Sequence, residues 1–128
     1  MSHAFCSAGA RAVGVLHAIL LGYCVAGVVL ALQGSLLGWK WVRRAGWRRV
    51  HAAVLLAVCA LNVWGVCCPL TAAQDALRAC AGRPPLPGGF VVSLFGAAGA
   101  TPAGVLRAEL ALLFAALVGL ATLKPEPA

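Results

Sequence analysis

The chain has 128 residues, of which 62% are hydrophobic and only 10% are charged, with 10 Lys or Arg against 3 Asp or Glu. Soluble domains carry about 25% charged residues and keep one face of each element polar, whereas several stretches of this chain show no such alternation. The composition excludes an ordinary soluble domain. It predicts one all-α membrane domain over residues 1–128, with the lipid bilayer as its first partner.

The formal net charge of +7 raises the question of nucleic acid, because clustered Lys and Arg neutralise phosphates. However, five of the ten basic residues lie in one short segment between two apolar runs, where the positive-inside rule places cytoplasmic charge. They are Lys40, Arg43, Arg44, Arg48 and Arg49. We therefore expect no nucleic-acid partner.

The first predicted span covers residues 12–37, which contain no charged side chain. At about 1.5 Å per residue, this run is more than long enough to cross a hydrocarbon core of about 30 Å. A secretory signal has a shorter apolar region of about 7–15 residues. We therefore expect the segment to be retained.

Two further spans are predicted at residues 50–68 and 102–123, which brings the expected number of transmembrane helices to three. The second span stops at Pro69, because proline cannot continue a helix. The third follows Thr101, a residue type that caps helix N-termini, and begins with proline at the first helical position.

A short interfacial helix is predicted at residues 72–81, outside the spans. Thr71 and Gln74 have the spacing of a capping box. In this motif the Thr71 hydroxyl accepts from the Gln74 backbone N–H, and the Gln74 side chain accepts from the Thr71 backbone N–H. Gly82 follows the expected end of this helix. Residues 88–100 form an apolar outer loop segment too short to span, so we expect it to lie at the interface or to re-enter the membrane.

The charges also predict the orientation. The basic segment between the first two spans contains tryptophans that alternate with the cations, a mixture typical of the cytoplasmic end of a membrane helix: Trp39, Trp41 and Trp47. The N-terminus and residues 67–102 then face outward, and the C-terminus is cytoplasmic. We expect a multi-pass protein of the bacterial inner (plasma) membrane.

Small residues at i, i+4 spacing occur in all three predicted spans, which favours close helix packing within the membrane. The stripes are Gly14, Ala18, Gly22 and Ala26 in the first span, Ala53, Ala57 and Gly65 in the second, and Ala111, Ala115 and Gly119 in the third.

A set of residues spread over most of the chain carries a family resemblance: Leu16-His17, Trp47-Arg48, His51, Cys68-Pro69-Leu70-Thr71, Leu77-Arg78 and Gly89-Phe90. With these residues the chain resembles a bacterial family of small membrane proteins known as domain of unknown function family 2784. The resemblance implies location and architecture and carries no established activity.

The chain also departs from that family's pattern. Relatives commonly have an acidic residue near Leu61 and Asn62, Glu at the position of Gln74, and His near Ser93. An activity that needs those ionisable groups is therefore in doubt here.

The two histidines of the predicted spans do not suit a shared haem or metal ion. His17 lies about six residues from the outer end of the first span, and His51 about two from the inner end of the second, so they are roughly 20 Å apart along the membrane normal. We expect no metal or cofactor at this pair, and we interpret His51 as an interfacial residue beside the basic segment.

A different set of polar residues is predicted to form one layer. His17, Asn62 and Glu109 each lie roughly 10 Å below the outer surface, one in each span. Polar side chains at this depth usually face the bundle interior, where they act as hydrogen-bonding glue or mark a proton-handling or ligand site. Glu109 has a third alternative, which is to reach the headgroups beside Arg107.

The six cysteines contain no C-x-x-C pair, so the sequence lacks the usual metal or redox spacing. Cys6 lies near a terminus that we expect to be mobile. Cys67, Cys68 and Cys80 share the oxidising side, and a disulfide between Cys68 and Cys80 would close a loop over the short helix.

No catalytic residue is predicted. The leading hypothesis is a non-enzymatic, structural or partner-binding protein of the inner membrane, whose partner is another membrane protein or a second copy of the chain. The alternative is a redox or ligand-binding membrane protein that uses the polar layer or the outer cysteines, for example to pass electrons from thiols to a quinone.

Overall fold

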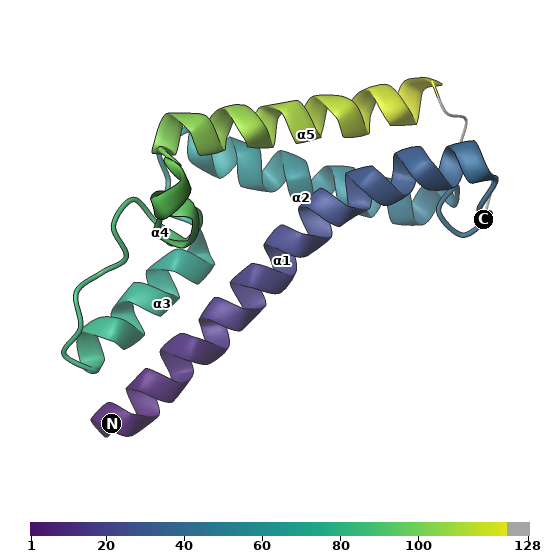
Figure 1. Cartoon of the computed structure of the whole chain (residues 1–128). Helices are drawn as coiled ribbons and strands as arrows, with labels where there is room; N and C mark the ends of the chain where they lie inside the picture. Colours follow the sequence, from purple (N-terminus) through teal and green to yellow (C-terminus); the bar gives the residue numbers. More distant parts are fainter. Residues whose placement is uncertain (123–128) are drawn as a thin grey trace. The chain divides into compact units, whose positions relative to one another are not determined.

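The computed structural model describes residues 1–122, in which it places five α-helices, one 3₁₀ turn and no β-strand. In chain order they are α1 (His3–Leu37), α2 (Ala45–Val63), α3 (Pro69–Cys80), α4 (Phe90–Phe95), η1 (Gly96–Ala98) and α5 (Pro102–Thr122), as drawn in Figure 1. The all-α fold class is therefore confirmed. Leu123, the predicted last residue of the third span, lies outside the described residues.

Two helices, α1 and α5, are long and apolar enough by length and composition to cross a membrane. The predicted second span does not meet these criteria of length and composition. The described residues therefore contain two candidate membrane-spanning helices, where the sequence predicted three. The reason is the position of α2, which begins five residues before the predicted span and includes Arg48 and Arg49. It also ends five residues early, at Val63.

The early end of α2 has a local cause that we missed in the sequence. Gly65 has a φ of 66°, a left-handed conformation that glycine adopts without steric cost. The N–H of Val66 then donates to the Leu61 carbonyl at 2.8 Å, and the N–H of Gly65 donates to that of Asn62 at 3.2 Å. This pair of bonds is a Schellman motif, which closes the helix before Pro69 is reached.

The first helix begins nine residues earlier than predicted. The Ser2 hydroxyl accepts a hydrogen bond from the Phe5 N–H at 3.2 Å and so caps the N-terminus of α1. The prediction started the helix after Arg11, where the uncharged run begins. Because an arginine does not interrupt a helix, α1 is longer than that run. At about 1.5 Å per residue, the 35 residues of α1 extend to about 52 Å.

At α5 the predicted start is confirmed, since the helix begins at Pro102 and the Thr101 hydroxyl accepts from the Gly104 N–H at 3.1 Å. The predicted capping box of α3 is wrong. This helix begins at Pro69, so Thr71 and Gln74 lie within it, and both are buried. The helix ends at Cys80, one residue before the predicted end, and Gly82 lies just beyond it with a positive φ of 69°.

The described chain divides into two compact units. The first unit contains residues 1–20 and 61–106, and the second contains residues 21–60 and 107–122. Each unit is described separately below.

In the first unit, α3 packs antiparallel to the N-terminal half of α1. Cys6 is joined to Cys80, Gly9 faces Leu77, and Gly14 faces Gln74, so the partner residue moves back along α3 as the chain moves forward along α1. The loop after α3 is held to this helix by two bonds. Arg78 Nε donates to the Pro84 carbonyl at 2.8 Å, and Asp75 accepts from the Leu86 N–H at 2.9 Å.

In the second unit, the C-terminal half of α1 packs against α2 and the turn before it. Gly34 faces Val42, which is fully buried, and Gly27 faces His51. The small-residue stripes are confirmed only in part, because nothing lies within 4 Å of where a Cβ on Gly22 would be. On α5 the buried small residue is Gly119.

Candidate functional site

Two groups of polar side chains are buried in the described structure, one in each unit. The first contains His17 on α1 with Thr71 and Gln74 on α3, and the second contains Arg48 and His51 on α2. Residues in both groups carry the family resemblance described above.

The first group, which we call the His17–Gln74 cluster, consists of His17, Thr71, Gln74 and Phe90. The His17 ring stacks on Phe90 with ring centroids 4.3 Å apart and an interplanar angle of 13°. Phe90 reaches this place at the start of α4, after the glycine turn at Gly89. Glycine on the facing helix leaves room for Gln74, since a Cβ on Gly14 would lie 2.8 Å from Gln74 Nε2.

Two polar atoms of the cluster have no hydrogen-bond partner within the described part of the chain. They are His17 Nδ1 and Gln74 Oε1, on side chains only 8% and 7% exposed. Leaving a buried polar atom unpaired costs about 1–3 kcal/mol. Since an amide oxygen accepts and an imidazole nitrogen either donates or accepts, the pair is suited to holding a small polar molecule.

The disulfide of the structure corrects the predicted one. Cys80 is bonded to Cys6, with a Cα–Cα distance of 5.8 Å, and Cys68 is a free, half-buried thiol. The prediction failed because we expected the N-terminus to be mobile. In fact the Ser2 cap begins a helix there, and Gly9 packs against Leu77 one turn away from the bond.

The second group, which we call the Trp47–His51 cluster, consists of Tyr23, Trp47, Arg48 and His51. His51 is 3% exposed, and its Nε2 lies 3.0 Å from the carbonyl oxygen of Cys24 on α1, at hydrogen-bond distance. One face of its ring stacks on Trp47 at 5.6 Å, and Tyr23 meets it edge-on at 5.2 Å. The ring is therefore enclosed between helices, which the sequence did not indicate, and the placement of His51 at the membrane interface stays a prediction.

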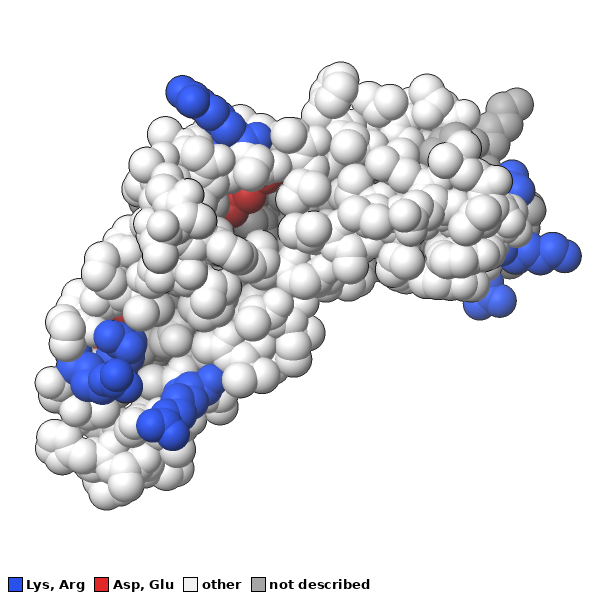
Figure 2. Space-filling view, viewed as in Figure 1, with Lys and Arg blue, Asp and Glu red and all other residues white. Residues whose placement is uncertain are grey.

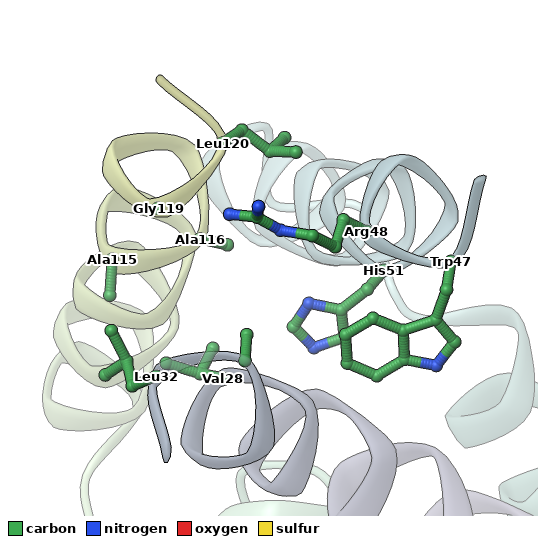
Figure 3. A pocket seen from close by; sticks show the side chains of 10 residues that line it. Val28, Leu32, Trp47, Arg48, His51, Ala115, Ala116, Gly119 and Leu120 are labelled. Carbon is green, nitrogen blue, oxygen red and sulfur yellow. The ribbon is translucent and has the colours of Figure 1, made fainter. Parts of the chain in front are cut away.

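A narrow hollow lies beside this cluster, within the same unit. The Arg48 guanidinium extends from α2 towards α5, where a Cβ on Gly119 would lie 3.3 Å from Nη2 (Figure 3). Apolar side chains of α1 and α5 form the remaining walls, among them Val28, Leu32 and Leu120.

The predicted polar layer is distributed over both units. His17 and Asn62 belong to the first unit and Glu109 to the second. His17 is buried, Glu109 is half-buried and Asn62 is exposed. The grouping of the three residues stays a prediction.

Among residues 1–122, no three His, Cys, Asp or Glu side chains are grouped so as to hold a metal ion. The histidines of the two clusters lie in different units, and each is packed against an aromatic ring.

Comparison with known families decides where the chain belongs. The sequence profile of the family described as protein of unknown function DUF2784 matches residues 7–125. The chain belongs to this family. The match covers nearly the whole sequence and confirms the resemblance inferred from the motif residues.

One human protein is similar over a shorter stretch. It is described as the uncharacterized protein encoded by LINC01561, and it is 43% identical over 49 residues, which are 37% of this chain and 38% of that protein. The chain therefore spans less than half of this relative's length. No solved structure matches the chain.

The DUF2784 motif falls into the two clusters. His17 stacks on Phe90 in the first unit, where Thr71 is also buried, and Trp47, Arg48 and His51 line one hollow in the second. The sequence pointed to these residues but did not show that glycines lie opposite them, at Gly14, Gly27 and Gly119. Gly14 and Gly119 belong to the predicted small-residue stripes, whereas Gly27 does not. Only the facing helix shows which glycine makes a close contact.

Proposed function

We propose that this DUF2784 protein is a small, non-enzymatic integral membrane protein that acts by binding another membrane protein or a second copy of itself. The observation that carries the proposal is the apolar face of α5. Leu110, Phe114 and Leu117 lie at i, i+4 and i+7, on one side of the helix, and all three are exposed. Phe114 is 71% exposed, which in water would be a large cost, so this face needs a cover of lipid or of a partner helix.

The other long apolar helix supports a membrane location in the same way. Leu16, Ile19 and Val29 are among the exposed apolar residues of α1. Charged atoms occupy only a few places on the face drawn in Figure 2, and most of that surface is uncharged. Lipid or a partner helix would cover such a surface.

Two independent features support the orientation, with the N-terminus outside and the C-terminus in the cytoplasm. The basic residues between α1 and the middle of α2 favour a cytoplasmic position. The Cys6–Cys80 disulfide favours an oxidising compartment for both cysteines, on the opposite side. A bacterial inner membrane, with the periplasm outside, meets both requirements.

The same disulfide supports a membrane crossing by α2, which would bring the number of crossings to three. Because Cys6 and Cys80 have to meet on one side of the membrane, the chain between them crosses an even number of times. If α1 crosses once, α2 has to return. Its 19 residues extend to about 28 Å, enough when Arg48 and Arg49 lie at the headgroups.

Site-specific photocrosslinking in native membranes tests the proposal. A photoreactive phenylalanine analogue at Phe114 is expected to trap a discrete protein product, either a dimer or a larger complex. The same analogue at Leu112, which is half-buried on α5, serves as the matched control and is expected to give much less. Lipid adducts alone at Phe114, with no protein product, would contradict partner binding through this face.

A second candidate function, a ligand-binding or redox membrane protein, is favoured by the two unpaired atoms His17 Nδ1 and Gln74 Oε1. Gln74→Met separates the two hypotheses. Replacing the amide by an apolar side chain of similar size should be close to neutral for stability if the cluster only packs, and should abolish ligand retention if it binds. Mass spectrometry of gently purified protein, with wild type as reference, measures that retention.

A further inference from the structure

We propose that the His17–Gln74 cluster binds a small, apolar phenol, with its ring on the His17 imidazole in the place of the Phe90 ring. The proposal rests on the second candidate function, ligand binding, and names the chemical class of the ligand. The residues that carry it all lie within the first unit, and none of them belongs to the apolar face of α5.

The Phe90 ring lies where three parts of the cluster meet. Its face stacks on His17, and its edge atom Cε2 lies 3.9 Å from where a Cβ on Gly14 would be. Gln74 Nε2 lies 2.8 Å from that same point, which is about one turn of α1 away from His17. The space of this ring is therefore bordered by an imidazole face, an amide group and a bare stretch of helix backbone.

Phe90 belongs to a segment that can withdraw without unfolding a long helix. It starts α4, which has six residues, none of them buried. Glycines with positive φ lie on both sides of this helix, at Gly88, Gly89 and Gly99, and glycine passes between positive and negative φ at low steric cost. The half-buried Phe90 ring thus acts as a plug that a ligand of similar shape can replace.

The two unpaired atoms of the cluster decide which polar group fits. Gln74 Oε1 only accepts a hydrogen bond, whereas His17 Nδ1 donates when it carries the ring proton. One hydroxyl group serves both atoms, since it donates to Oε1 and accepts from the Nδ1–H. A ketone oxygen only accepts, so it would leave Gln74 Oε1 without a donor.

An aromatic ring on that hydroxyl suits the rest of the site. It keeps the stacking contact that His17 makes with Phe90, at ring centroids 4.3 Å apart, and such contacts add to the stabilisation from buried area. A plain aromatic hydrocarbon would cover the imidazole but leave both polar atoms unpaired. A saturated alcohol would pair them but give up the stacking, so a phenol alone of these three meets both requirements.

The test measures equilibrium binding of three radiolabelled probes to the protein in lipid nanodiscs, with empty nanodiscs as the correction for partition into lipid. The probes are p-cresol, toluene, which lacks the hydroxyl group, and 4-methylcyclohexanol, which lacks the aromatic ring. We expect wild type to bind p-cresol about tenfold more tightly than toluene, because toluene leaves two buried polar atoms unpaired. It should bind p-cresol about threefold more tightly than 4-methylcyclohexanol, because only the aromatic ring stacks on His17.

Two pairs of variants locate the site. Gln74→Met removes the accepting oxygen and should abolish the preference for p-cresol over toluene, whereas Gln33→Met removes the same group from an exposed position of α1 and should keep it. Phe90→Ala removes the competing ring and should strengthen p-cresol binding by at least about threefold. Phe95→Ala shortens an exposed side chain of the same short helix and should have no effect.

The outcomes separate this proposal from the function on which it rests. Equal binding of p-cresol and 4-methylcyclohexanol, lost in Gln74→Met, would overturn the phenol class and keep ligand binding at this site. No preference for p-cresol over toluene in wild type, or the same loss in Gln33→Met as in Gln74→Met, would overturn the site itself. If Gln74→Met fails to fold, the three probes on wild type and the Phe90→Ala pair still decide the outcome.

Discussion

His51 of α2 lies directly against the backbone of Gly27 on α1, at the place where any larger residue would have its Cβ. This approach brings His51 Nε2 within 3.0 Å of the Cys24 carbonyl oxygen, one turn away along α1. A buried side chain of one helix thus lies at hydrogen-bond distance from the backbone of another, and glycine makes the approach sterically possible.

Gly27→Ala is therefore expected to destabilise the protein by about 1–3 kcal/mol, because the new methyl group overlaps the imidazole and forces the two helices apart. Gly22→Ala is the matched control on the same helix. Nothing lies within 4 Å of its Cβ position, so the higher helix propensity of alanine should leave stability unchanged or increase it by about 0.5–1 kcal/mol. Thermal unfolding in detergent measures both variants, and an equal effect of the two would contradict the role of Gly27.

The disulfide predicts a specific pattern among the cysteines. Cys6→Ser and Cys80→Ser should each destabilise the protein by about 4 kcal/mol in the chain-entropy estimate for a separation of 74 residues, and the double variant should be no worse than either. Cys68→Ser should leave the bond intact. Counting free thiols with a maleimide-polymer reagent under non-reducing conditions checks the pairing. Wild type should show four free thiols and Cys68→Ser three, whereas five in Cys68→Ser would show that Cys68 is a partner.

The orientation predicts opposite labelling of positions 2 and 45. In a background that lacks the four free cysteines but keeps Cys6 and Cys80, a cysteine at Ser2 should react with a membrane-impermeant maleimide in intact cells. A cysteine at Ala45, beside the basic residues, should react only after permeabilisation. Labelling of position 45 in intact cells would invert the topology and place the basic segment outside.

Glu109→Gln tests the predicted polar layer. If the side chain is only glue, the amide still forms hydrogen bonds, and stability should fall by less than about 1 kcal/mol, as for typical polar contacts in membranes. A double-mutant cycle with His17→Gln should show an interaction energy if both residues belong to one layer. Strict additivity of the two effects would separate Glu109 from His17 and contradict a single polar layer.

The sequence alone predicted the features that short stretches of chain encode. The apolar runs identified α1 and α5, and proline after a cap residue marked the start of α5 at Pro102. Glycine marked the end of α3, where Gly82 has a positive φ. These features depend on side chains acting on backbone groups a few residues away, so no distant partner is needed to infer them.

Only the tertiary structure decided which distant residues meet. The antiparallel packing of α3 on α1 selected Cys6 as the partner of Cys80 and buried Gln74 opposite Gly14, although a capping role for Gln74 fitted its spacing equally well. The packing of α2 on α1 likewise enclosed His51 and brought it to the Cys24 carbonyl, a contact that the sequence did not reveal. Local patterns could not reveal these contacts, because burial and pairing depend on which helix faces lie together, and many residues in so apolar a chain are equally suited to a buried position.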